Sequence, residues 1–291
     1  MRILILGHKG MLGSELMLRL ARAHDVAGRD VDAFDLTSEN DCRRVVQECS
    51  PKVVINAAAY TNVDGCEANR EACFAVNAAG VKNIALACRG KGVALVHFST
   101  DYIFDGRKRT PYDEEDPPAA LNAYGASKLE GERFLQSLAE SYLLIRTAWL
   151  YGRHGKNFVK TILEKASTVK TLEVVDDQIG SPTYSRHLAA AVEVLVAGGH
   201  RGVFHVTNSG QCSWYEFART IVEYAGMNDV TVRPIGSDRL SRPAPRPAWS
   251  VLSAEKFTAA TGRTMPDWRQ ALREYLGETH GETAGQENTG R

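Results

Sequence analysis

The sequence has little that would tie the protein to a membrane or to nucleic acid. Its 291 residues contain no apolar run near the roughly 18 residues that a membrane-spanning helix needs. The first apolar stretch, Ile3 to Leu6, is too short for the core of a signal peptide and is followed by glycine. The 35 basic and 35 acidic residues leave no net charge to attract an anionic partner. We therefore expect a cytosolic protein that binds neither a membrane nor nucleic acid.

Patterns for metal or redox chemistry are also lacking. The six cysteines form no Cys-x-x-Cys pair, and no histidine stands at zinc spacing from them. Five of the six lie in the first third of the chain, mostly within helical patterns. We expect reduced cysteines that pack as small apolar side chains, and no metal site.

What the sequence does contain is a regular alternation of strand and helix patterns. The short β-branched runs "RILILG", "KVVINAA" and "VALVHFST" predict buried strands, and amphipathic stretches stand between them. This order predicts an α/β protein with a parallel sheet and helices on both faces. After Tyr151 the alternation becomes less regular, which indicates a second, smaller unit.

A glycine-rich turn follows the first expected strand. The segment "LILGHKGMLG" places Gly7, Gly10 and Gly13 between the strand and the helical stretch "SELMLRLAR". Such a turn lets backbone N–H groups and a helix N-terminus approach a pyrophosphate. Three glycines alone are a weak signal, but their place in the first β–α unit favours dinucleotide binding.

The end of the second expected strand leaves the choice of cofactor open. This strand should meet the adenosine ribose at Arg29-Asp30. An acidic residue there favours the free 2′-hydroxyl of NAD, whereas an arginine can receive the 2′-phosphate of NADP. Because both residues are present, NADH and NADPH remain equal alternatives.

These patterns predict two interleaved units and a tail. We expect residues 1–150 and 171–197 to form a dinucleotide-binding domain, and residues 151–170 and 198–277 to form a smaller substrate lobe. Residues 278–291 contain no large apolar side chain, so we expect a disordered tail there.

A tyrosine and a lysine stand one helical turn apart in "NAYGASKLEGE". A free tyrosine has a pKa of about 10, and a nearby ammonium favours its phenolate, so Tyr124 and Lys128 suit proton transfer. Tyr-x-x-x-Lys alone is common on solvated helix faces. However, Ser99 and Thr100 end the strand "VALVHFST" and should point into the same crevice, where ligands bind in open parallel sheets. The combination favours a catalytic pair.

Several motifs together resemble a known family. The Gly-x-x-Gly-x-x-Gly spacing is similar to that of extended short-chain dehydrogenases/reductases. The segments "GHKGMLG", "NAAAYTNVD", "STDYIFDG", "YGASKLEGE", "RTAWLYG" and "DDQIGSPT" resemble, in order and spacing, the dTDP-4-dehydrorhamnose reductase family. The likeness runs from Met1 to about Leu276 and implies a Rossmann-type sheet plus a smaller C-terminal substrate lobe. The segment "SRPAPRPAWSVL" departs slightly from the family pattern through its extra prolines and Trp249.

The resemblance implies a role for each matching residue. Tyr124 is expected to donate a proton, Lys128 to hold the nicotinamide ribose and lower the pKa of the tyrosine, and Thr100 to hydrogen-bond the keto oxygen. The residues expected to bind the cofactor are Gly7, Gly10, Met11, Leu12, Gly13, Arg29, Asp30, Asp35, Leu36, Ala59, Tyr60, Thr61, Phe98, Tyr124 and Lys128. The residues expected to bind the substrate are Thr100, Asp101, Trp149 and Arg246.

The implied reaction is hydride transfer from NADPH or NADH to C4 of dTDP-4-dehydro-L-rhamnose, a step that needs no metal. The partner is then a dTDP-sugar, and the sequence leaves both a monomer and a homodimer open. Guanidinium groups bind phosphate in a bidentate manner, which suggests partners for the diphosphate. These candidates are Arg153, Lys156, Arg239, Arg242 and Arg246. Trp214 and Trp268 are assigned to packing.

Two alternatives remain. A non-catalytic relative, such as the regulatory subunit of methionine adenosyltransferase, would share the fold and bind a dinucleotide without needing Thr100, Tyr124 and Lys128. A nucleotide-sugar epimerase or dehydratase would carry the same Tyr/Lys pair but would retain its cofactor tightly. The stretch "STDYIF", in place of Thr-Asp-Glu, argues against a dehydratase.

Overall fold

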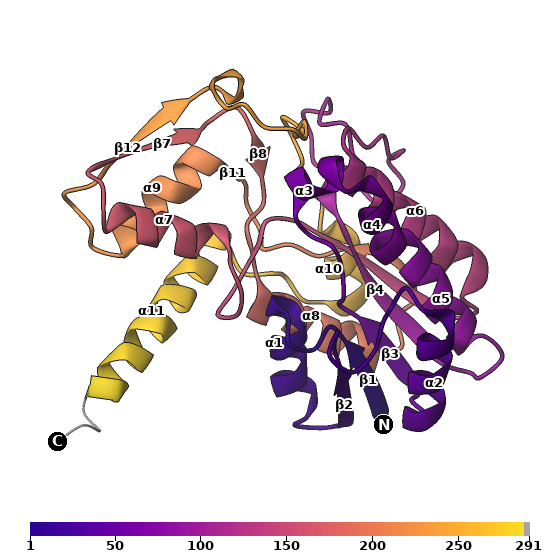
Figure 1. The fold of residues 1–291 in the computed structure, drawn as a ribbon. Helices are drawn as coiled ribbons and strands as arrows, with labels where there is room; N and C mark the ends of the chain where they lie inside the picture. Colours follow the sequence, from indigo (N-terminus) through magenta and orange to yellow (C-terminus); the bar gives the residue numbers. More distant parts are fainter. Residues whose placement is uncertain (288–291) are drawn as a thin grey trace.

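The computed structural model describes the backbone of residues 1–287 and the side chains of residues 1–278 (Figure 1). A six-stranded sheet, in the order β10-β5-β4-β3-β1-β2, forms the larger part, and each neighbouring pair is parallel. Its strands are β1 (Arg2–Leu6), β2 (Asp25–Arg29), β3 (Val53–Asn56), β4 (Ala94–Thr100), β5 (Tyr142–Thr147) and β10 (Gly202–His205). The predicted parallel α/β sheet is confirmed.

Helices cover both faces of this sheet because its central strands are apolar on both sides. In β1, Ile3 and Ile5 pack with α1 (Met11–Leu20) and α8 (Ser185–Ala197) on one face. Leu4 and Leu6 point to the opposite face, as the two-residue period of a strand requires. The helices on that face are α2 (Glu39–Cys49), α5 (Gly80–Cys88) and α6 (Ala123–Leu138), with α3 (Val63–Ala68), α4 (Arg70–Phe74) and the π-helical turn Ala75–Ala79 preceding α5.

A smaller lobe lies beside the sheet and has its own core (Figure 1). Its strand pairs are β6 (Leu150–Tyr151) with β9 (Thr183–Tyr184), β7 (Thr171–Val175) with β12 (Thr231–Ile235), and β8 (Ile179–Gly180) with β11 (Cys212–Ser213). Its helices are α7 (Phe158–Ala166), α9 (Trp214–Tyr224) and α11 (Trp268–Glu287). Trp268 is fully buried in this core, as the assignment to packing predicts.

The division between the two units differs from the expected one. Strand β7, expected in the dinucleotide-binding domain, pairs with β12 in the smaller lobe. Strand β10, expected in the substrate lobe, joins the edge of the main sheet beside β5. Helix α10 (Glu255–Thr261) also returns to the main core through Phe257. A short apolar run specifies a buried strand but not the sheet that it joins, so the sequence could not assign these elements.

Helix α11 (Trp268–Glu287) extends into the segment expected to be a disordered tail. Glu278, its first residue, continues α11, and that helix runs to Glu287. The Glu278 carboxylate accepts hydrogen bonds from Arg153 at 2.7 Å and from the Tyr184 hydroxyl at 3.0 Å, and it also pairs with Arg186. Residues 288–291 lie outside the described chain. Composition alone missed these contacts because they join segments far apart in the sequence.

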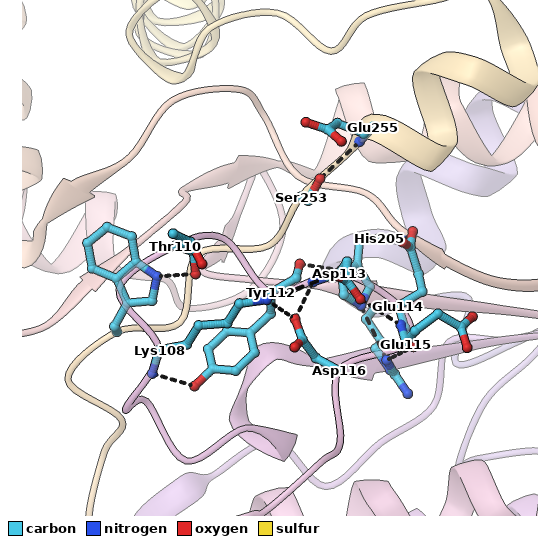
Figure 2. Close-up of polar contacts among 12 residues, drawn as sticks. Lys108, Thr110, Tyr112, Asp113, Glu114, Glu115, Asp116, His205, Ser253 and Glu255 are labelled. Atoms are coloured by element: carbon cyan, nitrogen blue, oxygen red, sulfur yellow. Dashed lines mark hydrogen bonds and ion pairs between the residues drawn. The ribbon is translucent and has the colours of Figure 1, made fainter.

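A buried network of charges ties α6 to the edge of the sheet. Arg146 on β5 donates two hydrogen bonds to Glu132 on α6, at 3.1 and 2.9 Å, and both side chains are at most 5% exposed. The Arg146 guanidinium also meets Nε2 of His205, whose Nδ1 faces the carbonyl of Tyr112. Figure 2 shows how Tyr112, Glu114 and their loop approach His205. The loop before α6 is thereby fixed to β10.

All six cysteines are free and buried, as expected of side chains that pack as small apolar groups. Their reduced state remains a prediction. Within the described part of the chain, none of the helices combines the length and the apolar character that crossing a bilayer requires.

Candidate functional site

A cavity of about 510 Å³ opens where the carboxyl ends of the parallel strands face the smaller lobe. Segments following β1, β3, β4 and β5 contribute one wall, and the lobe contributes Lys156 and Trp214. Its lining consists of Gly10, Met11, Leu12, Ala57, Ala59, Thr61, Val63, Phe98, Ser99, Thr100, Asp101, Tyr102, Tyr124, Lys128, Thr147, Ala148, Trp149, Leu150, Lys156 and Trp214. Ligand sites of open α/β sheets lie at this edge.

The glycine turn brings backbone to the floor of this cavity. Gly7 has a φ of 75°, a conformation that favours glycine, and its N–H donates to the carbonyl of Arg29 at 2.8 Å. At Gly13 an added Cβ would lie 2.1 Å from the carbonyl oxygen of Gly7, so α1 sits directly against the turn. Gly10 is the N-cap of α1 and has no side chain that could occupy the free N–H groups of the helix. The first turn of α1 contains no acidic residue. This cradle fits the diphosphate of a dinucleotide.

The turn provides a first testable prediction. Replacing Gly13 by alanine should lower the free energy of unfolding by about 1–3 kcal/mol, because the new methyl group meets backbone that cannot move alone. We also expect NADPH affinity to fall, because α1 must shift away from the turn. Denaturant titration and fluorescence titration with NADPH measure the two effects.

Gly277→Ala is the matched control. An added Cβ there meets nothing within 4 Å, and the residue lies in α11 rather than in the glycine turn. This variant should keep its NADPH affinity and gain slightly in stability, since alanine favours a helix over glycine. Equal NADPH affinity in the two variants would contradict the assigned role of Gly13.

Helix α6 presents Tyr124 and Lys128 to the same cavity. Asn122 caps the N-terminus of this helix: its side chain accepts from the N–H of Gly125 at 2.8 Å and donates to the carbonyl of Pro245 at 2.7 Å. Tyr124 therefore stands in the first turn, and its ring packs edge-on against Tyr102 at 6.0 Å. The Asn122 side chain thus joins the first turn of α6 to the backbone at Pro245, which holds the phenol in place.

The electrostatics of this pair differ from the expected ones. Burial raises the pKa of Tyr124 above its ordinary value, the charge of Asp101 adds to this shift, and a hydrogen bond with Thr100 opposes it. Burial also lowers the pKa of Lys128 to about 8. The net shift of the Tyr124 pKa is therefore upward, because desolvation disfavours the phenolate. A lowering of this pKa by Lys128 remains a prediction.

Three polar atoms around Thr100 lack protein partners. Among the described residues, Ser99 Oγ, Asp101 Oδ2 and Thr147 Oγ1 are buried without a hydrogen bond, and all three residues line the cavity. Thr100 Oγ1 donates to the other carboxylate oxygen of Asp101 at 3.0 Å. Because a buried polar atom without a partner is costly, this cluster fits a ligand rich in hydroxyl and amide groups. A nicotinamide ribose or a sugar has that character.

Several residues expected to bind the cofactor lie outside the lining. Asp30 accepts from the N–H of Lys9 at 2.8 Å, and Arg29 donates to the carbonyl of Gly28. Asp35 accepts from Thr37, while Leu36 is buried against Gly80. The main chain of Tyr60 is held by Asn77. Their roles in binding remain predictions; Gly7 and Gly13 shape the turn without lining the cavity.

The substrate side differs from expectation at two residues. Arg246 is engaged by a bidentate ion pair with Asp64, at 2.7 and 2.8 Å, and does not line the cavity. Trp214, which was assigned to packing, lines the cavity and stacks on Trp149 with ring centroids 3.5 Å apart. Nothing in the sequence around Trp214 distinguishes it from a core tryptophan. Lys156 is the diphosphate candidate that reaches the lining.

The parallel sheet, its glycine turn and the Tyr-x-x-x-Lys helix define an oxidoreductase of the extended short-chain dehydrogenase/reductase class. The finer assignment comes from comparison with known proteins. The family model of the RmlD substrate binding domain matches residues 1–280. The chain belongs to this family.

Individual relatives agree with this assignment. The chain is 40% identical to a dTDP-4-dehydrorhamnose reductase of Mycolicibacterium smegmatis, over 97% of this chain and 87% of that protein. It is 38% identical to a dTDP-4-keto-6-deoxy-D-glucose reductase of Streptomyces niveus, over 93% and 95%. A crystal structure of dTDP-4-dehydrorhamnose reductase from Bacillus anthracis in complex with NADP matches with a TM-score of 0.93 and 39% identity, covering 95% of this chain and 99% of that one.

Proposed function

We propose that the protein reduces the C4 ketone of dTDP-4-dehydro-L-rhamnose to dTDP-L-rhamnose with NADPH or NADH. The observation that supports this most directly is that Thr100, Tyr124 and Lys128 line the same cavity as Gly10 of the glycine turn. A proton donor and a cradle for a dinucleotide diphosphate therefore share one crevice. The reductase names and the NADP complex among the relatives point to the same reaction.

Each group has a distinct task in this proposal. When bound, the reduced nicotinamide supplies a hydride. The Tyr124 hydroxyl donates its proton to the oxygen that develops at C4, while the Thr100 hydroxyl holds that oxygen in place. The raised pKa of Tyr124 keeps the phenol protonated through the neutral range, as a proton donor requires. Lys128 holds the nicotinamide ribose.

The smaller lobe completes the site for the dTDP-sugar. Trp149 and Trp214 form a stacked pair of indoles, a surface suited to the flat faces of a sugar or base. Lys156 brings a positive charge to the same wall and can meet the diphosphate. Asp101 contributes a buried carboxylate whose Oδ2 has no hydrogen-bond partner among the described residues, although the Ser250 and Thr100 side chains both stabilise the charged form.

A spectrophotometric assay tests the proposal. We expect the protein to oxidise NADPH or NADH when dTDP-4-dehydro-L-rhamnose is added, and to form dTDP-L-rhamnose. The two cofactors are compared at equal concentration, since Arg29 and Asp30 leave the preference open. Absence of oxidation with both cofactors would overturn the proposal and favour the non-catalytic alternative. Purification with tightly bound NAD, and no net oxidation, would favour an epimerase.

Two further predictions from the sequence belong with this proposal. A cytosolic location and the choice between monomer and homodimer remain predictions, and sedimentation of the purified protein settles the second. The substrate could also be a close 4-keto relative, as the Streptomyces niveus protein illustrates by its name. Assaying dTDP-4-keto-6-deoxy-D-glucose beside the rhamnose precursor distinguishes them.

A further inference from the structure

Trp149 has an unusual backbone conformation at the wall of the cavity. It lies shortly after β5 and has a φ of 46°, in the left-handed region that side chains other than glycine rarely adopt. Among the described residues other than glycine, only Ser50 shares this property. The Trp149 carbonyl accepts from the N–H of Thr183 at 3.2 Å, which fixes the main chain there. Strained backbone of this kind persists only where neighbouring groups hold it, and it clusters at ligand sites.

The indole of Trp149 is also held in an unusual arrangement. The rings of Trp149 and Trp214 are within 7° of parallel, and their centroids are 3.5 Å apart. Rings with centroids this close lie almost directly over each other, whereas aromatic pairs prefer an offset or edge-on arrangement. The attraction between the two indoles does not select this geometry by itself. The surrounding chain therefore imposes it.

Gly180 is the second residue that holds this indole. A Cβ added at Gly180 would lie 2.4 Å from Cε2 of Trp149 and 2.7 Å from its Cζ2 and Nε1. The φ of Gly180 lies outside the left-handed region, so the backbone conformation does not require glycine there. Glycine is required because the indole occupies the space that a side chain would take.

The smaller lobe brings Gly180 and Trp214 to the same place. Gly180 on β8 pairs with Cys212 on β11, and Trp214 begins α9 shortly afterwards. Ser213, between them, caps α9 and donates a hydrogen bond to Asp176 at 2.5 Å. The indole that they hold belongs to the segment after β5 of the main sheet. This contact therefore joins the two units at the cavity.

We propose that Gly180 and Trp214 are positioning residues that hold the Trp149 indole in one orientation, as a wall of the subsite for the dTDP-sugar. The identity of this ligand rests on the proposed function. Because the ring is already ordered, the sugar gains a contact without the entropy cost of ordering a large side chain. The two indoles stay stacked when the sugar binds.

Nitrogen-15 NMR of the tryptophan indoles tests this arrangement without any assay. The chain has four tryptophans, so four indole N–H signals are expected, and single substitutions assign them. A proton held over the face of a stacked ring resonates upfield of the same proton in solvent. We expect the Trp149 signal to lie upfield and to move downfield in Trp214→Leu and in Gly180→Ala. The signal of Trp268, in the core of the lobe, should stay in place and shows that each variant is folded. An unchanged Trp149 signal in either folded variant would overturn the proposal.

Gly277→Ala and Trp249→Phe are the matched controls. A Cβ added at Gly277 meets nothing within 4 Å, and the Trp249 indole donates to the carbonyl of Thr110 instead of joining the stack. Both variants should leave the Trp149 signal at its wild-type position. A shift in either control as large as that in Gly180→Ala would overturn the proposal, since the signal would then not depend on the local contact.

Substrate kinetics provide a second readout. The KM for dTDP-4-dehydro-L-rhamnose should rise about tenfold in Trp214→Leu and in Gly180→Ala, but less than about threefold in Trp214→Phe, which keeps an aromatic ring beside Trp149. The values of kcat and the affinity for NADPH should change little, because Thr100, Tyr124 and the glycine turn are untouched. A fall in kcat at unchanged KM would overturn the proposal.

Addition of the product tests whether the stack persists. With saturating dTDP-L-rhamnose the Trp149 signal should remain upfield. A move to the position seen in Trp214→Leu would show that the ligand parts the rings, and would overturn the proposal. If the signals depend on Gly180 and Trp214 as expected while the protein reduces no 4-keto sugar, the proposed function fails and the positioning of Trp149 stands.

Discussion

Replacing Tyr124 by phenylalanine should reduce turnover by about 10²–10⁴-fold while NADPH binding is retained. The change removes one hydroxyl from the cavity that also contains Thr100 and the glycine turn. A positioned general acid contributes a factor of that size. Asp101 and Tyr102 also line the cavity, but they belong to the turn after β4 and not to α6. Single-turnover oxidation of NADPH with the sugar ketone, together with fluorescence titration of NADPH, separates chemistry from binding.

Tyr151→Phe is the matched control for this experiment. Tyr151 is fully buried, does not line the cavity, and its hydroxyl has no hydrogen-bond partner among the described residues. Removing that oxygen should leave turnover unchanged and should not reduce stability, because no hydrogen bond is lost. Wild-type turnover in Tyr124→Phe would remove Tyr124 from the mechanism. Equal loss in both variants would indicate damage to the fold rather than to a proton donor.

Breaking the buried ion pair should have the largest effect on stability. Arg146→Met leaves the Glu132 carboxylate, 2% exposed, without its two hydrogen bonds. Removing one partner of a buried pair costs about 3–5 kcal/mol, since the remaining carboxylate stays buried and has lost its bidentate partner. Denaturant unfolding at neutral pH measures the loss directly.

A double variant identifies the cause of that loss. Arg146→Met combined with Glu132→Leu removes both charges and should recover most of the stability, because the desolvation cost disappears with them. Arg133→Met, on the same helix, breaks an exposed pair with Glu130 and should change stability by no more than about 0.5 kcal/mol. If the double variant were as unstable as Arg146→Met, lost packing rather than an unpaired charge would be responsible.

The sequence predicted those parts of the fold and of the site that depend on local patterns of residues. The spacing of Gly7, Gly10 and Gly13 predicted a tight turn in which the first helix approaches the end of the first strand closely. The structure shows this close approach at Gly13. Tyr124 and Lys128 stand on one face of a helix because four residues make about one turn. Thr100 reaches the same crevice because parallel strands all end at one edge of the sheet.

Other parts depend on contacts between distant segments, which local pattern does not encode. Nothing in the run "GVFHVTN" says that β10 pairs with β5 rather than with a strand of the lobe. The sequence suggested Arg246 as a phosphate partner, but in the structure its guanidinium pairs with Asp64. Trp214 and Trp268 each begin a helix, yet one lines the cavity and the other is core. The directions of the pKa shifts likewise follow from burial, which the sequence does not give.

The placement of β10 constrains how the chain folds during synthesis and how it can be cut into fragments that fold. Residues 202–205 supply the outer strand of the main sheet, although the other five strands are complete by residue 147. During synthesis the sheet must therefore wait, with the edge of β5 uncovered, until the first part of the smaller lobe and α8 have been translated. For the same reason a fragment ending near residue 150 would expose that edge to other chains, and a single proteolytic cut cannot release either half as an intact folded unit.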